Sequence, residues 1–197
     1  MTAQDLSALI GSRICHDLIS PLGAIGNGVE LLSMSNIGNI PEIGLIEDSV
    51  TNANARIKFY RIAFGVSSSD AELAASEVKS VVSGMYKRAR MSVDWSDQES
   101  RPRDQVKLAF LLLQCAENAM PWGGRASVTH DGTRWIMRCS AERIKQDQTL
   151  CGWLDGSTEV DRIAAADVQF ALAPIAANAA GRDVGIEWSD VSLTLSF

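Results

Sequence analysis

The sequence is poor in several features that define common functional classes. It contains only two histidines and four cysteines, and no two cysteines have the C-x-x-C spacing of a zinc or redox motif. It has no N-terminal basic segment followed by an apolar core, and no later apolar run is long enough to span a membrane. We therefore expect no bound metal, free thiols and a cytoplasmic protein.

An excess of basic residues is also absent. The formal net charge is −6, whereas a protein that binds nucleic acid broadly needs clustered Lys and Arg to neutralise phosphates. We therefore expect no direct contact with nucleic acid. The length of 197 residues and the hydrophobic content of 46% suit one large domain or two small ones with a buried core.

The first strong pattern is an amphipathic helix that carries one of the two histidines. Its apolar residues recur at steps of three or four: Ile14, Leu18, Leu22, Ile25, Val29 and Leu32. At about 100° per residue they form one stripe roughly 80° wide, which must face other protein. His16 lies about 160° from the centre of that stripe, so it points to solvent or to a partner. Its neighbours on the exposed side are Ser20, Gly23, Asn27 and, at the margin, Arg13.

A histidine in this position is suited to carry a phosphoryl group. A neutral imidazole offers a ring nitrogen that can attack phosphorus. Asp17 can hydrogen-bond the other ring nitrogen, which fixes the tautomer and stabilises the positive charge that develops on the ring. Pro21 cannot donate to the carbonyl of Asp17 and should bend or loosen the helix there. Spacing alone also permits an exposed surface histidine beside an incidental kink.

The run Cys-His-Asp-Leu-Ile-Ser-Pro-Leu over residues 15–22 resembles the H-box of sensor histidine kinases. The longer segment over residues 12–32 is similar to ChpT-type histidine phosphotransferases of alphaproteobacteria, and the similarity extends over the whole chain. That family resembles a histidine kinase with a dimerising helical hairpin and a degenerate ATPase-like domain, and it relays phosphate between receiver domains without ATP. The resemblance implies that His16 is the phosphoacceptor, that this chain binds no cofactor, and that the partner receiver holds Mg²⁺.

The resemblance also implies the partners. The donor would be the receiver domain of a hybrid histidine kinase of the CckA type, and the acceptors would be response regulators of the CtrA type. Docking is expected on the first helix and on the adjoining part of the C-terminal domain. The positions that could meet a receiver are Arg13, Ile19, Ser20, Gly23 and Asn27. Arg13 could attract the acidic receiver pocket or be merely solvated, and Ser20 could bond the phosphate or its own helix.

A second helix is predicted after a break rich in Ser, Asn, Gly and Pro over residues 33–41. Its apolar residues form a heptad seam: Ile43, Ile46, Val50, Ala53, Ile57, Tyr60 and Phe64. A lone hairpin cannot enclose its apolar stripe, whereas two hairpins from two chains complete a four-helix bundle. We therefore predict a homodimer. The alternative is that the stripe packs against the C-terminal domain of its own chain.

The run Gly-Val-Ser-Ser-Ser-Asp over residues 65–70 marks a domain boundary. We predict a helical-hairpin domain for dimerisation and phosphotransfer over 1–67 and an α/β domain over 68–197. In the second domain we expect helices over 76–90, 103–120 and 167–180, and strands over 91–95, 125–130, 133–140, 183–188 and 191–197. Helices interleaved with hairpins indicate an α+β fold, with helices on one face of a mixed sheet. Their order resembles the histidine-kinase ATPase domain.

This second domain lacks the glycine-rich segment that lets a kinase backbone approach nucleotide phosphates. Where kinases resemble Gly-x-Gly-Leu-Ala, residues 168–174 read Val-Gln-Phe-Ala-Leu-Ala-Pro. Gln114 and Asn118 lie where the kinase N-box would lie, and we interpret both as structural. Asp155 and Gly156 form either a remnant of the adenine-contacting motif or a common turn. We therefore expect no ATP binding.

Our main hypothesis is a phosphotransferase that carries phosphate on His16 between receiver aspartates. Two other hypotheses stay open, a non-enzymatic dimeric adaptor that binds response regulators and an ATP-dependent histidine kinase. The second histidine, His130, adjoins the Asp-Gly turn at residues 131–132, and we expect it to end a strand rather than to bind a ligand.

Overall fold

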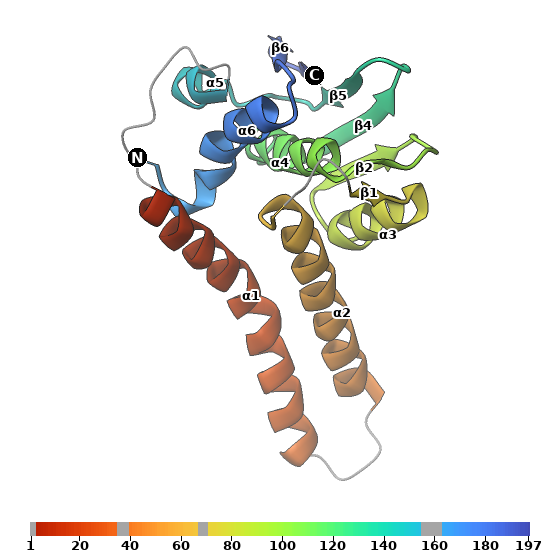
Figure 1. The fold of residues 1–197 in the computed structure, drawn as a ribbon. Coiled ribbons are helices and arrows are strands. Elements are labelled where there is room, and N and C mark those ends of the chain that lie inside the picture. Colours follow the sequence, from red (N-terminus) through yellow and green to blue (C-terminus); the bar gives the residue numbers. More distant parts are fainter. Residues whose placement is uncertain (1–2, 35–39, 67–70, 155–162) are drawn as a thin grey trace.

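Two long helices at the start of the chain form an antiparallel hairpin (Figure 1). In the computed structural model, which describes residues 3–34, 40–66, 71–154 and 163–197, α1 spans Ala3–Met34 and α2 spans Ile40–Ala63. α1 continues through Pro21, so the proline that we expected to loosen the helix does not end it. Within the described ranges, no helix combines the length and the apolar character needed to cross a membrane.

The second part of the chain is built around a five-stranded mixed sheet with the strand order β2-β4-β5-β7-β6. Its strands are β2 (Met91–Trp95), β4 (Gly124–His130), β5 (Trp135–Ser140), β6 (Gly185–Trp188) and β7 (Ser192–Ser196). β2 and β4 are parallel, and the other neighbours are antiparallel. Two short strands, β1 (Glu72–Leu73) and β3 (Arg101–Pro102), form a separate antiparallel pair.

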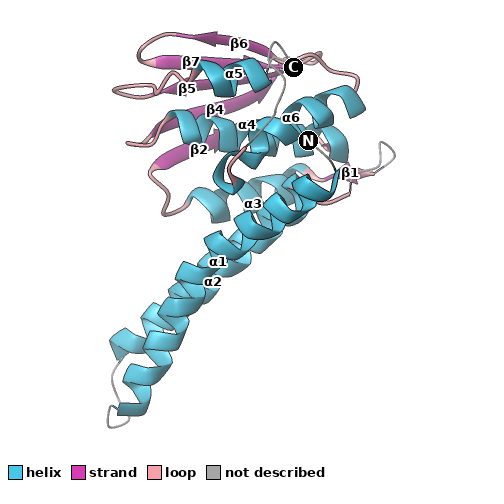
Figure 2. Cartoon of the chain, turned by 90° about the vertical axis from the view of Figure 1, so that its left-hand side faces the viewer, coloured by secondary structure: helices cyan, strands magenta, loops and turns pink. Residues whose placement is uncertain are grey.

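Helices lie against one face of this sheet (Figure 2). They are α3 (Ala75–Tyr86), α4 (Arg103–Ala119), α5 (Gln148–Leu154), the 3-10 helix η1 (Ala165–Asp167) and α6 (Val168–Ala179). α4 is the central helix of the core, because nearly every residue from 106 to 116 is buried. Along β5, Trp135, Met137 and Cys139 are buried and alternate with less buried residues. That alternation is typical of a strand with one covered face.

The predicted architecture, a helical hairpin followed by an α/β sandwich, is confirmed. The helices predicted over 103–120 and 167–180 and the strand over 91–95 agree with α4, α6 and β2 to within one residue at each end. The helix predicted over 76–90 ends earlier, at Tyr86, because the chain turns there to enter β2. The short elements α5, β1 and β3 were not predicted. The predicted domain boundary after residue 67 lies outside the described residues and stays a prediction.

The end of α2 shares its core with the α/β domain. Phe59 is fully buried, and its ring stacks on Phe110 of α4 with a centroid separation of 4.5 Å. The same ring meets Tyr86 of α3 edge to face at 5.9 Å. Ile62 and Ala63 belong to the same buried cluster. Contacts among aromatic rings therefore hold the upper end of the hairpin on the second domain. Phe59, Ile62 and Ala63 lie outside the predicted heptad seam.

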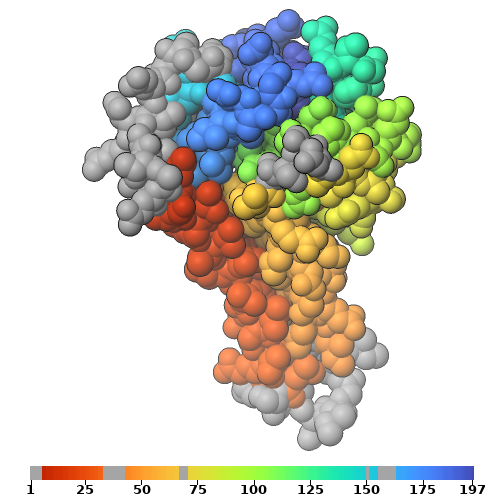
Figure 3. Space-filling model, in the orientation of Figure 1, coloured from red at the N-terminus to blue at the C-terminus, as the bar shows by residue number. Residues whose placement is uncertain are grey.

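Further from the α/β domain, the hairpin projects as a stalk (Figure 3), and part of its predicted apolar stripe stays uncovered. Ile14, Leu18 and Ile25 of α1 are partly buried. Exposed apolar side chains from the two predicted stripes are Leu22 and Val29 of α1 and Ile43, Val50 and Ile57 of α2. The single chain therefore covers only part of the apolar surface that the heptad pattern provides.

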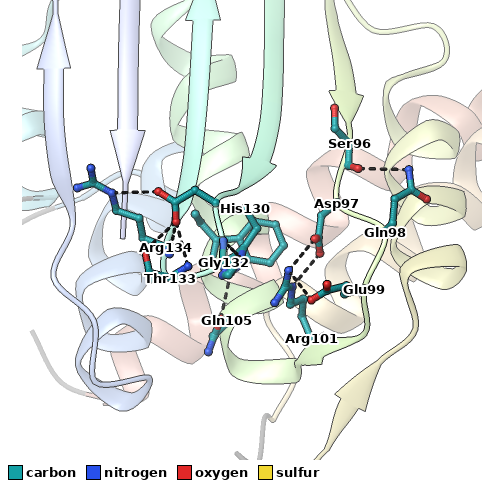
Figure 4. A network of polar contacts seen from close by, with 12 residues as sticks. Ser96, Asp97, Gln98, Glu99, Arg101, Gln105, His130, Gly132, Thr133 and Arg134 are labelled. Carbon is teal, nitrogen blue, oxygen red and sulfur yellow. Dashed lines mark hydrogen bonds and ion pairs between the residues drawn. The ribbon is translucent and has the colours of Figure 1, made fainter.

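A polar network closes one end of the sheet (Figure 4). Arg101 bonds both oxygens of Asp97, at 3.0 and 2.8 Å, and its guanidinium lies 5.9 Å from the centroid of the Trp135 ring. The indole N–H of Trp135 donates to Gln105 at 3.1 Å. His130 ends β4, as predicted, and its Nδ1 accepts the backbone N–H of the following glycine at 3.1 Å. This glycine, residue 132, has φ of +98°, as the Asp-Gly turn requires.

The aromatic contact between α2 and α4 leads to a stability prediction. Replacing Phe59 with Ala should lower the free energy of unfolding by about 3–5 kcal/mol, because it removes a fully buried ring and leaves a cavity. Ile175→Ala on α6, where the side chain is exposed, is the matched control and should change it by no more than about 0.5 kcal/mol. Urea unfolding of both variants measures the difference, and equal losses would contradict a shared core at Phe59.

Candidate active site around His16

His16 lies on the outer side of α1, as the helical spacing predicts, with 84% of its side chain exposed. Its Nδ1 lies 3.0 Å from Oδ1 of Asp17. Among the described residues, this carboxylate is the only hydrogen-bond partner of the ring. The imidazole is therefore held through one nitrogen, and the other nitrogen, Nε2, is left available to a reacting group.

Asp17 is the buried member of the pair, with 11% of its side chain exposed. Its second oxygen, Oδ2, accepts the Nε–H of Arg13 at 2.8 Å and the hydroxyl of Tyr60. A terminal nitrogen of Arg56 lies 3.9 Å from the same oxygen. Arg13 comes from the preceding turn of α1, while Tyr60 and Arg56 come from α2. The carboxylate thus joins both helices of the hairpin.

These contacts determine the charge states in the site. Burial by itself would raise the pKa of Asp17, but hydrogen bonds from Tyr60 and His16 and the charge of Arg13 outweigh burial and lower that pKa. Burial, followed by the hydrogen bond to Asp17, raises the pKa of Tyr60 to about 12. At neutral pH, Asp17 is therefore an ionised carboxylate, and Tyr60 keeps its hydroxyl proton and acts as a hydrogen-bond donor.

A cleft of about 420 Å³ opens beside the histidine. Its walls come from α1, from α2 and from the segment that follows α3. The residues that line it are His16, Asp17, Ser20, Pro21, Ala24, Leu45, Asp48, Ser49, Asn52, Arg56 and Arg88. Arg88 reaches across to Asp48 of α2, with a nitrogen to oxygen distance of 2.8 Å. The α/β domain therefore contributes a cation to the rim of the cleft.

The five positions predicted to meet a partner are not equivalent. Ile19, Ser20, Gly23 and Asn27 are all exposed, and a Cβ added at Gly23 would meet no atom within 4 Å. Arg13 differs, because only 18% of its side chain is exposed and it bonds both Asp17 and the backbone carbonyl of Ala166 in η1. Arg13 is therefore not merely solvated, and its contact with a receiver stays a prediction.

Three residues of the site were not predicted. Tyr60 was assigned to the apolar seam, although a buried tyrosine hydroxyl usually has a hydrogen-bond partner, and that rule was a usable signal. Arg56 lies one turn before it, at a polar position of the same helix. Arg88 comes from the other domain, and no local pattern indicates its contact with Asp48.

Gln114 and Asn118, which we compared with a kinase N-box, have different surroundings in the structure. Asn118 donates to the carboxylate of Asp167 at 2.8 Å. Gln114 is buried, and neither atom of its amide has a hydrogen-bond partner among the described residues. The cavity beside Asn118, lined also by Cys115, Cys151 and Phe170, has a volume of about 20 Å³. That space fits about one water molecule.

Of two further sequence features, only one can be placed. Residues 168–174 form the start of α6, a regular helix, where a kinase would have a glycine-rich loop. The pair at residues 155–156 lies outside the described residues. In the part of the chain that is described, no group of three or more His, Cys, Asp or Glu side chains is arranged to hold a metal ion.

Comparison with known proteins gives consistent matches. Residues 75–191 match the family described as histidine phosphotransferase C-terminal domain. The protein phosphotransferase ChpT of Brucella abortus (strain 2308) is 31% identical over 192 residues, which covers 94% of this chain and 91% of that protein. The solved structure of a bacterial phosphotransferase matches with a TM-score of 0.81 at 29% identity, covering 100% of this chain and 97% of that one. A histidine kinase domain from Erythrobacter litoralis EL346 matches with a TM-score of 0.44 at 10% identity, covering 99% of this chain and 93% of that one.

The lowered pKa of Asp17 predicts how the site affects acid stability. In the unfolded chain the carboxyl has its ordinary pKa near 3.8, and in the folded chain the pKa is lower. The stabilisation is therefore fully present above that ordinary value and is lost as the pH falls through the folded pKa. We expect the difference in free energy of unfolding between wild type and Asp17→Asn to shrink as the pH falls below about 4.

Urea unfolding of both proteins from about pH 6 to about pH 3 measures this difference. Taking the difference removes the contributions of other carboxyls with lowered pKa values, such as Asp97 and Asp131. A difference in free energy of unfolding that stays constant, or that grows as the pH falls, would show that the contacts to Asp17 do not favour its charged form.

Proposed function

Because the chain belongs to the histidine phosphotransferase family and is a protein phosphotransferase of a phosphorelay, we propose that His16 is the residue that carries the phosphoryl group. One observation supports this assignment above the others. His16 is an exposed histidine whose Nδ1 is held by a buried, ionised Asp17, so that Nε2 is free to act as a nucleophile.

The transfer proceeds by in-line displacement. The Nε2 lone pair of His16 attacks the phosphorus of an aspartyl phosphate on the donor receiver. As the N–P bond forms, the P–O bond to the receiver aspartate breaks, and its electron pair returns to that carboxylate. The ring keeps its proton on Nδ1 and becomes positively charged, and the Asp17 carboxylate at 3.0 Å stabilises that charge.

The second half of the relay reverses these bond changes. The aspartate of an acceptor receiver attacks the phosphorus, and the N–P bond breaks with its electron pair returning to Nε2. An acyl phosphate and a phosphohistidine are both reactive phosphoryl donors, so the transfer can run in either direction. Mg²⁺ bound by the receiver neutralises charge on the moving group, and this chain contributes the nucleophile and the docking surface.

This role requires no ATP. The small cavity beside Asn118 and the bond from Asn118 to Asp167 favour a structural role for the former nucleotide region. We propose that the chain binds neither nucleotide nor metal, and that Asn118 and Gln114 act as structural residues.

The proposed donor is a receiver of the CckA type, and the proposed acceptors are regulators of the CtrA type. The exposed side of α1 supports docking there, because Ile19, Ser20, Gly23 and Asn27 are exposed and 84% of the His16 side chain is exposed. These partners act in the cytoplasm, where we also place this protein, and any effect on DNA passes through the regulators.

We also propose that the protein is a homodimer. The exposed apolar side chains of the stalk occur on both helices, and a second hairpin would cover them in a four-helix bundle. In a monomer, Leu22, Val29 and Val50 would leave an extended apolar surface exposed to water, which lowers solubility.

The role of His16 is tested by transfer from a receiver domain of the CckA type that has been phosphorylated in advance. Wild type and His130→Gln should both take up acid-labile, alkali-stable label, whereas His16→Gln should take up none, because it lacks the nucleophile. The His130 variant is the matched control, since it removes the only other histidine. Incubation with magnesium and ATP alone should give no label.

Other results would lead to other functions. Label from ATP would establish a histidine kinase. Absence of label with cognate receivers, together with intact binding of those receivers, would favour a non-enzymatic adaptor. Label that survives in His16→Gln would place the phosphoacceptor elsewhere.

The dimer is tested by sedimentation of variants with a charge on the stalk. Val29→Glu and Val50→Glu should each shift the protein toward monomer, because a carboxylate buried without a partner in a bundle costs several kcal/mol. Ile175→Glu places the same charge at an exposed apolar residue of α6 and should leave the mass unchanged. A monomeric wild type, or stalk variants that sediment like wild type, would contradict this interface.

A further inference from the structure

We propose that Tyr60 of α2 is a positioning residue that selects which ring nitrogen of His16 reacts. This inference rests on the proposed role of His16 and goes beyond it, because it assigns the choice of nitrogen to a residue of the other helix. Tyr60 reaches the histidine only through Asp17, whose Oδ2 accepts its hydroxyl.

The need for such a residue follows from helix geometry. Neighbouring residues of an α-helix point about 100° apart, so their side chains do not face each other. His16 points outward with 84% of its side chain exposed, whereas Asp17 turns into the groove between the helices with 11% exposed. Their contact at 3.0 Å therefore depends on a particular orientation of the Asp17 carboxylate, with one oxygen turned back toward the ring.

The two oxygens of that carboxylate have different partners. Oδ2 accepts from Arg13 and from Tyr60, so donors from two directions fix the plane of the group. Oδ1 is left for Nδ1 of His16. An ionised carboxylate is an acceptor only, so Nδ1 must carry the proton and Nε2 must carry the lone pair. If the carboxylate rotates, this selection is lost.

Tyr60 is well suited to hold the carboxylate because it is itself immobile. Only 3% of the residue is exposed. Its ring stacks with Phe64 at 5.2 Å and meets Phe59 edge to face at 6.1 Å. Phe59 in turn stacks on Phe110 of α4. The hydroxyl that contacts Asp17 is therefore placed by the same aromatic cluster that fixes α2 on the α/β domain.

The charge states agree with this role. The pKa of Tyr60 is raised to about 12, first by burial and then by its bond to Asp17, so it stays a donor at every pH at which the relay works. The other charged groups around Asp17 are Arg13, Arg56 at 3.9 Å and Glu117 of α4. Burial raises the pKa of Glu117, against the charges of the two arginines. Among the hydrogen-bond donors to Oδ2, Tyr60 is the one without charge, so its removal leaves the net charge of the site intact.

Tyr60→Phe tests the proposal, because it removes the hydroxyl and keeps the ring. The matched control is Tyr86→Phe, which changes the only other tyrosine. The Tyr86 hydroxyl is also buried, but it has no hydrogen-bond partner in the described part of the chain. Thermal unfolding of both full-length variants establishes that they are folded under the conditions of the assays.

Two measurements separate positioning from a purely structural role. Nitrogen-15 NMR of the His16 ring reports the tautomer without any phosphate, and His16→Gln identifies its signals against those of His130. Single-turnover transfer from a phosphorylated receiver of the CckA type, at saturating receiver, reports the rate of the chemical step. Titration with unphosphorylated receiver gives Kd.

We expect Tyr60→Phe to lose part of its Nδ1–H tautomer and to transfer about 10- to 100-fold more slowly, the range expected when one hydrogen bond to a charged group is lost. Its Kd should stay unchanged, and Tyr86→Phe should match wild type in all three measurements. A Tyr60→Phe variant with the wild-type tautomer and rate would overturn the proposal. So would a change in Kd alone, which would assign Tyr60 to the docking surface, or an equal loss in Tyr86→Phe.

This design distinguishes failure of the inference from failure of the proposed function. If wild-type His16 takes up no label, the role of His16 as phosphoacceptor is wrong. The tautomer measurement then still decides whether Tyr60 orients the ring, since it is made on unphosphorylated protein.

Discussion

The carboxylate of Asp17 is the interaction on which the site depends. A charge that is mostly removed from water must be compensated, and here an arginine, a tyrosine and a histidine share it. These partners come from both helices of the hairpin. Through the bond of Arg13 to the Ala166 carbonyl, the same group is linked to the start of α6. The orientation of one exposed imidazole is therefore determined by three separate segments of the chain.

This linkage gives the α/β domain a role in positioning the hairpin. Its helix α4 presents Phe110 to Phe59, and that contact fixes the part of α2 that carries Tyr60 and Arg56. The segment after α3 adds Arg88 to the rim of the cleft. The α/β domain can therefore serve the reaction as a rigid support for the hairpin.

The sequence predicts best what depends on local periodicity. The extents of α4 and α6 followed from dense apolar runs, and the exposure of His16 followed from its angle to the apolar stripe. Tyr60 was assigned to the heptad seam, and its ring is buried. A heptad pattern predicts burial of the ring, but it does not predict a hydrogen bond from the hydroxyl. Arg13 was expected at the surface, because the angular positions of residues around one helix take no account of η1. That element lies more than 150 residues later in the chain. Arg88 was missed for the same reason, since a contact between domains leaves no local pattern.

The bond from Arg13 to the backbone of η1 has a consequence for how phosphate flows. Any movement of η1 away from α1 would break this bond, and the same arginine also holds Asp17. In the proposed relay, a site held by these contacts presents the same surface to a receiver that delivers phosphate and to one that removes it. The direction of phosphate transfer is then set by mass action. It depends on the concentration of each receiver and on the fraction of it that is already phosphorylated.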